Sequence, residues 1–290
     1  MGLLPSLEKV EVGGLTFRDF SQLWVREFEM GPESVETNDL DNPIYDDTYL
    51  GVDFHRGPTW TFEFIIEGRD ELEVIDNLDR VKAVWRNARN TKLAGTPIEL
   101  AYTVAGRERV VYGRPRRFAV SNIQTAQQGF VSVTAEFKLS DPLNYDADWE
   151  TVRLDAVPPD TRGLEEHLTE DTLTTEVGGV RQGQLPIVGG TAPTPFRVTL
   201  YGPTTNPGFT IAGRRYQFNT KLSANQRLTV DSRTGSVKRN QSTNMVHTMA
   251  DPTPIKNIRL EPGKAVEISF FGDDPTLSSY ATFSYRHARF

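Results

Sequence analysis

Cysteine is missing from all 290 residues of the sequence. This absence excludes disulfide bonds, thiolate metal sites and cysteine nucleophiles, and it suits a reducing compartment or an assembly held together by packing alone. Long apolar runs are missing too, so we find no candidate membrane-spanning segment. The first nine residues lack the basic and apolar regions of a signal peptide. We therefore expect a chain that is made in the cytoplasm of its host cell and kept as a soluble protein.

Basic charge is scarce in the first half of the chain. Residues 1–150 carry 16 basic and 26 acidic side chains, and residues 151–290 carry 16 and 13, so the net charges are −10 and +3. Neither half concentrates the basic side chains that would neutralise nucleic-acid phosphates. The charge pattern therefore disfavours specific nucleic-acid binding.

Catalytic and metal-binding motifs are also absent. The sequence has no glycine-rich phosphate loop, no nucleophile elbow and no His-Glu-x-x-His segment. No two of the four histidines stand at the spacing of a metal-binding pair: His55, His167, His247 and His287. We expect no catalytic residue, no metal and no cofactor, and hence no enzyme. A cell-wall hydrolase stays open as an alternative, because the spatial separation of a carboxylate pair cannot be read from sequence.

The composition indicates a globular protein rich in β-sheet. Hydrophobic residues make up 37% of the chain and charged residues 24%, and the aromatic residues are 16 Phe, 9 Tyr and 4 Trp. Aromatic side chains favour sheets, and the length suits two ordinary domains. Apolar and polar residues alternate along 60–66, 98–104 and 131–139, which predicts half-buried antiparallel strands. Shorter runs predict two further strands over 110–112 and 117–120. Gly13-Gly14 and Ala105-Gly106 are placed as hairpin turns.

One segment, residues 70–92, has the periodicity of an amphipathic helix. Its apolar residues recur at spacings of three and four, from Leu72 through Ile75, Leu78 and Val81 to Trp85. Asp70 is placed to cap the first turn, with Glu73 completing a capping box, and Gly95 is placed to end the helix.

The second half predicts a β-sandwich that follows a linker. Residues 156–190 contain paired prolines and glycines, which predicts an extended loop. Beyond it, short runs that predict strands, among them 216–222 and 255–260, return every 8 to 12 residues or so, the spacing typical of a sandwich. The predicted fold class is mainly β: an α+β first domain over 1–146, with an antiparallel sheet or barrel and one packed helix, and a β-sandwich over 147–290.

Several short motifs in a fixed order resemble the distal tail protein family of siphophages, the long-tailed phages. Asp141-Pro142-Leu143-Asn144-Tyr145 follows a long predicted strand, as the family's aspartate-proline-x-x-tyrosine signature does. Gly51-Val52-Asp53 and Gly113-Arg114-Pro115 resemble two elements before it, and Val198 to Pro203 resembles the start of the family's second domain. The closing Tyr285-Arg286 matches the family's last strand. The resemblance covers nearly the whole chain.

This resemblance implies a structural virion protein of the tail tip, also called a minor tail protein of the baseplate. Its first domain is expected to form a belt that assembles, as a hexamer, into a ring continuing the tail tube, and its second domain to be a galectin-like sandwich. The implied partners are further copies of the chain, the tail tube protein, the tape measure protein and the baseplate hub or tail-associated protein. A carbohydrate-binding tail module that recognises the host cell wall is the alternative.

Two sets of charged residues are candidate interaction sites. The segment from Glu29 to Asp53 has no Lys or Arg, and its acids either line the lumen of a ring through which DNA passes or form a solvated loop or a contact to a basic neighbour. Calcium chelation there lacks the spacing of a calcium loop. The basic set either docks on a neighbouring subunit or is a solvated turn. The acidic set is Glu33, Glu36, Asp39, Asp41, Asp46 and Asp47, and the basic set is Arg114, Arg116 and Arg117.

Overall fold

The computed structural model describes residues 7–19, 21–89, 96–155, 181–274, 276 and 278–290. The chain divides into two compact units, the first comprising Met1–Ala147 and Phe290, the second Asp148–Arg289. Each unit has its own cluster of buried hydrophobic side chains. The described residues contain one α-helix, and their sheets are antiparallel, which confirms the predicted mainly β, α+β fold class.

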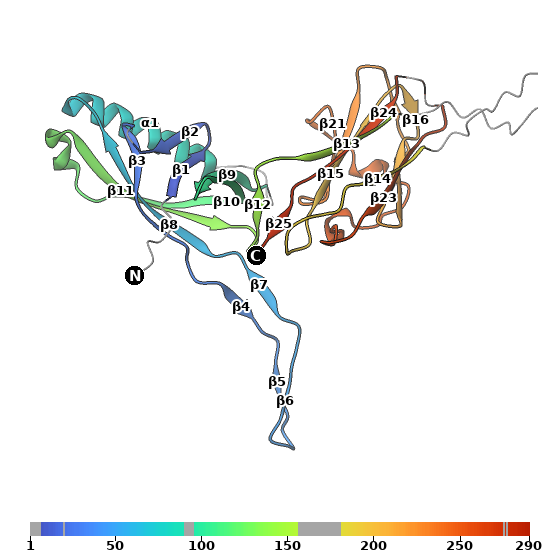
Figure 1. Cartoon of the computed structure of the whole chain (residues 1–290), viewed down its shortest axis with the longest axis horizontal. Coiled ribbons are helices and arrows are strands. Elements are labelled where there is room, and N and C mark those ends of the chain that lie inside the picture. Colours follow the sequence, from blue (N-terminus) through green and yellow to red (C-terminus); the bar gives the residue numbers. More distant parts are fainter. Residues whose placement is uncertain (1–6, 20, 90–95, 156–180, 275, 277) are drawn as a thin grey trace, which may run out of the picture. The chain divides into compact units, whose positions relative to one another are not determined.

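One twisted antiparallel sheet forms the frame of the first unit (Figure 1). β12 (Asn144–Asp146) adds to it by pairing with the central strand β10. The order of the other strands, from edge to edge, is β2 (Leu15–Arg18), β1 (Leu7–Val12), β9 (Ile98–Val104), β10 (Arg107–Val120), β11 (Phe130–Leu139), β8 (Thr59–Glu67) and β3 (Leu23–Glu29).

Alternation along β8 and β11 places one face of the sheet in the core. Phe62 and Phe64 are completely buried, and their rings stack with centroids 5.3 Å apart. Phe17 from the edge strand β2 stacks on Phe64 at 4.1 Å, so β2 and β8, which lie far apart in the strand order, share one core. Phe62 pairs with Ala135 and Phe64 with Val133 across the strands. The predicted hydrophobic alternation therefore corresponds to a buried face.

The helix α1 (Glu71–Arg89) lies along this buried face (Figure 1). Asp70 Oδ1 accepts the backbone N–H of Glu73 at 2.8 Å, which confirms the predicted cap. Glu73 Oε2 accepts the backbone N–H of Arg69 at 2.7 Å, one residue before the position that a capping box uses. Hydrogen bonds from the Arg69 side chain and backbone, and from Gln22, lower the pKa of the Glu73 carboxyl to about 2. Residues 90–92 and Gly95 lie outside the described residues.

The apolar face of α1 differs from the prediction at its first residue. Leu72 is 71% exposed, whereas Val74 is completely buried together with Val81. Leu78 and Trp85 complete the buried face, as predicted. The cap at Asp70 fixes where the first turn begins, and this directs position 72 to solvent and position 74 to the sheet.

Two hairpin predictions are confirmed, and two strands that were predicted separately form one continuous strand. Gly13-Gly14 joins β1 to β2, and Ala105-Gly106 joins β9 to β10, with positive φ at all four residues. This backbone suits the tight turns that connect twisted strands. The runs 110–112 and 117–120 belong to the single long strand β10, which bends where its register to β11 shifts between Pro115 and Phe118.

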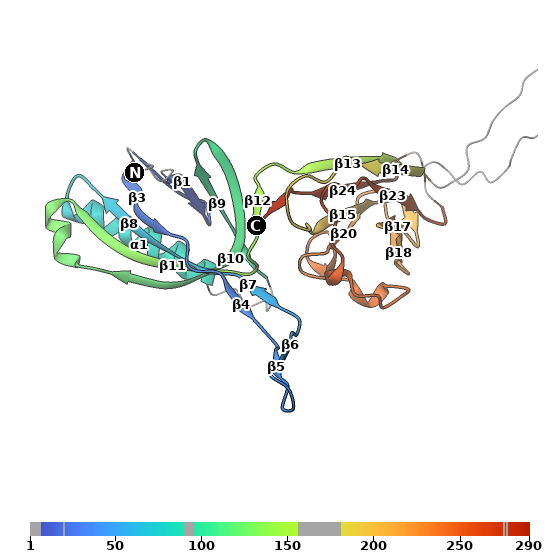
Figure 2. The same cartoon turned by 60° about the horizontal axis from the view of Figure 1, so that its bottom comes forward.

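Two facing sheets form the second unit (Figure 2). The first sheet has the order β13 (Glu150–Asp155), β24 (Tyr280–Tyr285), β15 (Phe196–Tyr201), β20 (Arg227–Asp231), β21 (Ser236–Arg239) and β22 (Thr243–Asn244). The second has the order β14 (Arg181–Leu185), β23 (Val266–Phe271), β17 (Gly208–Ile211) and β18 (Arg214–Gln217). Short pieces complete the unit: β16 (Thr204–Thr205), β19 (Lys221–Leu222) and β25 (Ala288–Arg289).

The second unit departs from the prediction in three segments. Residues 156–180 of the predicted loop lie outside the described residues, but 181–185 form β14, which is paired with β23. The predicted strand over 255–260 is instead the 3-10 turn η3 (Ile255–Asn257). The run 216–222 splits between β18 and β19, because Phe218 leaves β18 to bridge Met249. The second unit also contains the 3-10 turn η2 (Val246–Thr248), and the first unit contains η1 (Ile123–Gln128).

Candidate functional site

A hairpin between β3 and β8 concentrates exposed apolar side chains. This segment, residues 30–58, is called the arm below; Figure 1 shows its two paired stretches as a narrow ribbon. They are β4 (Ser34–Glu36) with β7 (Phe54–Arg56), and β5 (Leu40–Asp41) with β6 (Thr48–Tyr49). Nine large hydrophobic side chains of the arm are at least 47% exposed: Met30, Val35, Leu40, Ile44, Tyr45, Tyr49, Leu50, Val52 and Phe54.

Local hydrogen bonds give the arm a defined backbone. The N–H of Asn42 donates to the carbonyl of Asp47 at 3.0 Å, which closes the tip. The N–H of Ile44 donates to Asn42 Oδ1 at 3.0 Å, an arrangement that Asn favours in turns. Below the tip, the N–H of Gly51 donates to Asp39 Oδ1 at 2.8 Å. The exposed apolar groups therefore lie on an ordered ribbon.

The outer part of the arm is amphipathic. Leu40 lies directly opposite Tyr49, so the two side chains share one face of the ribbon. Asp41 lies opposite Thr48 on the other face, where the Thr48 hydroxyl lies 3.4 Å from Asp41 Oδ1. Contiguous exposed apolar side chains with a polar edge are typical of protein–protein contact sites. The arm therefore offers one face for a partner and one for water.

The predicted acidic set lies on the arm, and all of it is exposed. Arg56 Nε donates to Glu36 at 2.7 Å, so one acid is paired within the arm. Asp39 and Asp41 accept the hydrogen bonds described above. Within the described part of the chain, no ion pair involves the remaining three members, Glu33, Asp46 and Asp47.

The predicted basic set divides into one half-buried and two exposed side chains. Arg114 Nε and Nη2 donate to the carbonyl of Thr96 at 3.1 and 3.0 Å, which holds this side chain against its own unit. Arg116 and Arg117 are exposed, and Arg117 Nη1 lies 3.8 Å from Glu136 Oε1. Arg114 therefore has an internal role, and the exposed charge comes from Arg116 and Arg117.

The bend in β10 explains how these two arginines come to the surface. Between Pro115 and Phe118 the strand carries an additional residue relative to β11, which is a β-bulge. The buried Trp85 of α1 donates its Nε1–H to the carbonyl of Arg117 at 3.2 Å, so a carbonyl within the bulge has a partner in the core. The helix thereby holds the bulge in place.

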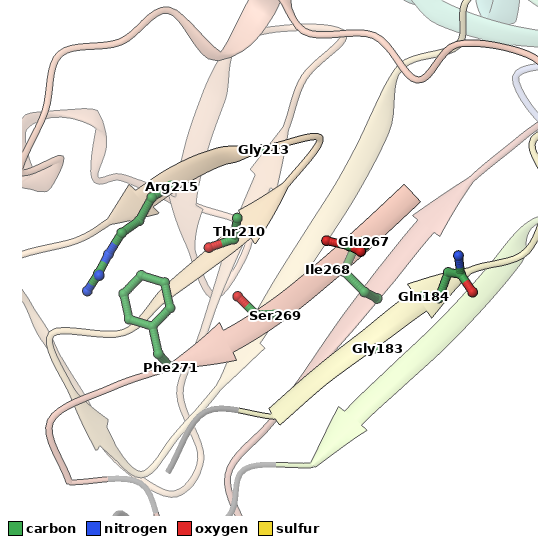
Figure 3. Close-up of a pocket in the computed structure, with 9 residues that line it drawn as sticks. All are labelled: Gly183, Gln184, Thr210, Gly213, Arg215, Glu267, Ile268, Ser269 and Phe271. Carbon is green, nitrogen blue, oxygen red and sulfur yellow. The ribbon is translucent and has the colours of Figure 1, made fainter. Parts of the chain in front are cut away.

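A groove on the second sheet of the second unit was not predicted. It has a volume of about 570 Å³ and lies over β14, β23, β17 and β18 (Figure 3). Its lining includes Gln184, Thr210, Arg215, Glu267, Ser269 and Phe271. Alternation along a strand such as β23 carries no sign of a groove. The hollow arises only when four strands from distant parts of the sequence lie side by side.

Within the described ranges we find neither a candidate metal site nor a candidate membrane-spanning helix. No three His, Asp or Glu side chains there are arranged to hold a metal ion. The α-helix in the described part of the chain is not long and apolar enough to cross a bilayer.

The two units in this order define a fold found in the tail hub and baseplate proteins of phages. No protein-family model and no curated protein sequence matches the chain. The Dit protein (gp 19.1) of phage SPP1, described as a paradigm of the hub adsorption apparatus in phages that infect Gram-positive hosts, is similar in structure, with a TM-score of 0.56 and 13% identity. The similarity covers 97% of this chain and 98% of that one.

Two structures of the phage P2 baseplate in its activated conformation are similar as well. The structure with Ca gives a TM-score of 0.58 at 11% identity, covering 97% of both chains. The structure with Sr gives 0.58 at 12% identity, covering 98% of both. At these identities the comparison shows a shared fold, and it confirms at that level the resemblance to distal tail proteins found in the motifs.

Proposed function

We propose that this chain is a structural component of the tail tip of a long-tailed phage, located in the virion and without enzymatic activity. The support is that the similarity to hub and baseplate proteins extends over 97% or more of the chain and includes both units in the same order. A shared fold alone does not fix function, so the argument rests also on the surfaces of this chain.

The observation that carries an assembly role is the exposed apolar arm. Side chains such as Leu40 and Tyr49, 70% and 62% exposed, are unfavourable in water, and burying them against a protein surface releases that cost. A contact between the arm of one copy and the body of the next is heterologous, and a heterologous contact closes into a ring when its rotation allows. We infer that the arm joins neighbouring copies of the chain in a ring, with six copies as the expected number.

The polar face of the arm then remains in water. We infer that the acidic set on the arm faces the channel of the ring, where fixed negative charge would keep passing DNA from adhering. Arg116 and Arg117 would dock on carboxylates of a neighbouring subunit, since guanidinium groups bind carboxylates in a bidentate fashion. The ring would sit between the tail tube and tape measure proteins on one side and the baseplate hub on the other.

Electron microscopy and mass measurement of the purified full chain test the ring. The wild type should give closed rings, and the double variant Leu40→Ser with Tyr49→Ser should give smaller particles that keep the wild-type circular dichroism spectrum. The matched control is Leu72→Ser with Ile187→Ser, which removes apolar side chains of similar exposure outside the arm and should leave the rings intact. Equal loss of assembly in both double variants would contradict the role of the arm.

A further inference from the structure

The floor of the groove on the second unit is made by small side chains. Ser269 in β23 lies opposite Thr210 in β17, and Thr210 lies opposite Arg215 in β18. The three side chains therefore form one row across three strands. The hydroxyl groups of Ser269 and Thr210 are short, which leaves space above them for a ligand (Figure 3).

One end of the groove is a stacked pair, Phe271 and Arg215. Phe271 lies opposite Gly208, and its ring covers that glycine so closely that a Cβ there would overlap it. The guanidinium carbon of Arg215 lies 4.1 Å from the centroid of the Phe271 ring. A guanidinium held on an aromatic ring keeps its N–H groups available while it loses side-chain freedom before a ligand arrives.

The other end of the groove has a carboxylate and a side-chain amide. Glu267 in β23 lies opposite Gln184 in β14, and both side chains are exposed. Glu267 and Arg215 are two strands and about two residues apart, which corresponds to roughly 12 Å between their Cα atoms. No ion pair of either side chain is found in the described part of the chain. The two charges are thus separate recognition groups.

We propose that this groove binds a neutral oligosaccharide segment of two or three sugar units. The guanidinium at one end donates hydrogen bonds, the carboxylate at the other accepts them, and the hydroxyls and the Gln184 amide between them do both. Sugar hydroxyls are donors and acceptors at once, so a glycan satisfies all these groups. The length between the charged ends and the volume of about 570 Å³ suit two or three rings.

Charge and the shape of the lining favour this ligand over two others. An anionic polymer would meet Glu267 at one end of the groove, and its attraction to Arg215 would be offset there. An apolar peptide segment would cover the exposed side chains of Arg215, Glu267 and Gln184 without offering them hydrogen-bond partners, which is unfavourable. The proposal places glycan recognition on the sheet formed by β14, β23, β17 and β18. The glycan is recognised mainly by hydrogen bonds and not by stacking on a row of exposed aromatic rings.

The test is binding of the purified full-length protein to an array of neutral oligosaccharides of two to six units, followed by calorimetric titration of the best ligand. The expected result is saturable binding that weakens about tenfold or more in Glu267→Ala and in Arg215→Ala, the usual effect of removing a hydrogen bond to a charged group. Arg214→Ala, which removes the same charge from the same strand beside the groove, and Glu261→Ala should bind as the wild type does.

Three outcomes would overturn the proposal: no neutral glycan bound, binding only of anionic glycans or phosphate polymers, or binding unaffected by Glu267→Ala and Arg215→Ala. Ring assembly is measured on the same variants. Both groove residues are exposed and lie outside the arm, so the two variants should form rings as the wild type does. Loss of glycan binding with intact rings would thus leave the proposed assembly role in place, and loss of rings in the wild type would leave the groove testable.

Discussion

Leu40 and Tyr49 face each other across the outer pairing of the arm, with more than half of each side chain exposed to solvent. In a monomer this pair contributes only a cross-strand contact to stability, because neither side chain reaches the core. Its position on one face, with Asp41 and Thr48 on the other, is what a partner surface requires. The proposed contact between copies would give this exposed apolar pair a partner surface.

The acidic residues of the arm should control affinity for DNA. If they face the channel, the double variant Asp46→Lys with Asp47→Lys should still assemble, and it should acquire DNA binding that weakens as salt rises. An electrophoretic mobility assay at two salt concentrations measures this, with the wild type remaining unbound. DNA binding unchanged by the two lysines would argue that the tip of the arm lies away from the channel.

Arg116 and Arg117 should contribute to contacts between subunits. Changing both to Glu is expected to lower the stability of the ring by at least about tenfold in dissociation constant, through repulsion of the carboxylates they would otherwise bind. Analytical ultracentrifugation at low and high salt measures the change. The control is Lys82→Glu with Arg86→Glu, which reverses two exposed charges on α1. An equal effect in the control would point to net charge instead of docking.

The two leucines of α1 should differ sharply in their effect on stability. Leu78→Ala opens a cavity in the core and should lower the free energy of unfolding by about 2–5 kcal/mol. Leu72→Ala removes a side chain that is 71% exposed and should change it by no more than about 0.5 kcal/mol. Chemical denaturation followed by the signal of the first unit compares them. Similar losses in the two variants would place position 72 in the core.

Glu73 should make the stability of the first unit depend on pH in the acid range. Its pKa is about 2 in the folded chain, against an ordinary value of 4.5, so its ionised form stabilises the fold fully above about pH 5. This contribution should fade as pH falls from 5 towards 2. Glu73→Gln should flatten the dependence in that range, whereas Glu71→Gln should retain it. Parallel pH curves for wild type and Glu73→Gln would contradict the cap geometry.

Much of the fold follows from local rules that sequence displays. Alternation around Phe62 and Phe64 defines buried strands, the cap at Asp70 defines the start of the helix, and glycine pairs such as Gly13-Gly14 define hairpins. Where the prediction was wrong, packing decided the outcome. Leu72 matched the helical spacing as well as Val74 did, and only the direction of the first turn against the sheet separates them.

The interaction surfaces were harder to predict for two different reasons. The charges of the arm could be counted in sequence, but its two faces depend on the pairing of Leu40 with Tyr49, which sequence does not state. Arg114 is close to Arg116 and Arg117 in the sequence. Its side chain, however, donates to the carbonyl of Thr96 within its own unit, whereas the other two are exposed. The groove joins Gln184, Arg215 and Glu267 from three distant segments, and no local pattern connects them.

The central claim, that the chain is a structural part of the phage tail tip, is tested most directly by locating it in assembled virions. Antibodies raised against the purified chain should label only the distal end of intact tails in electron micrographs, and density for a ring of this fold should lie at that end. Tails that contain the chain along the tube or at the head, or that lack it altogether, would contradict the account.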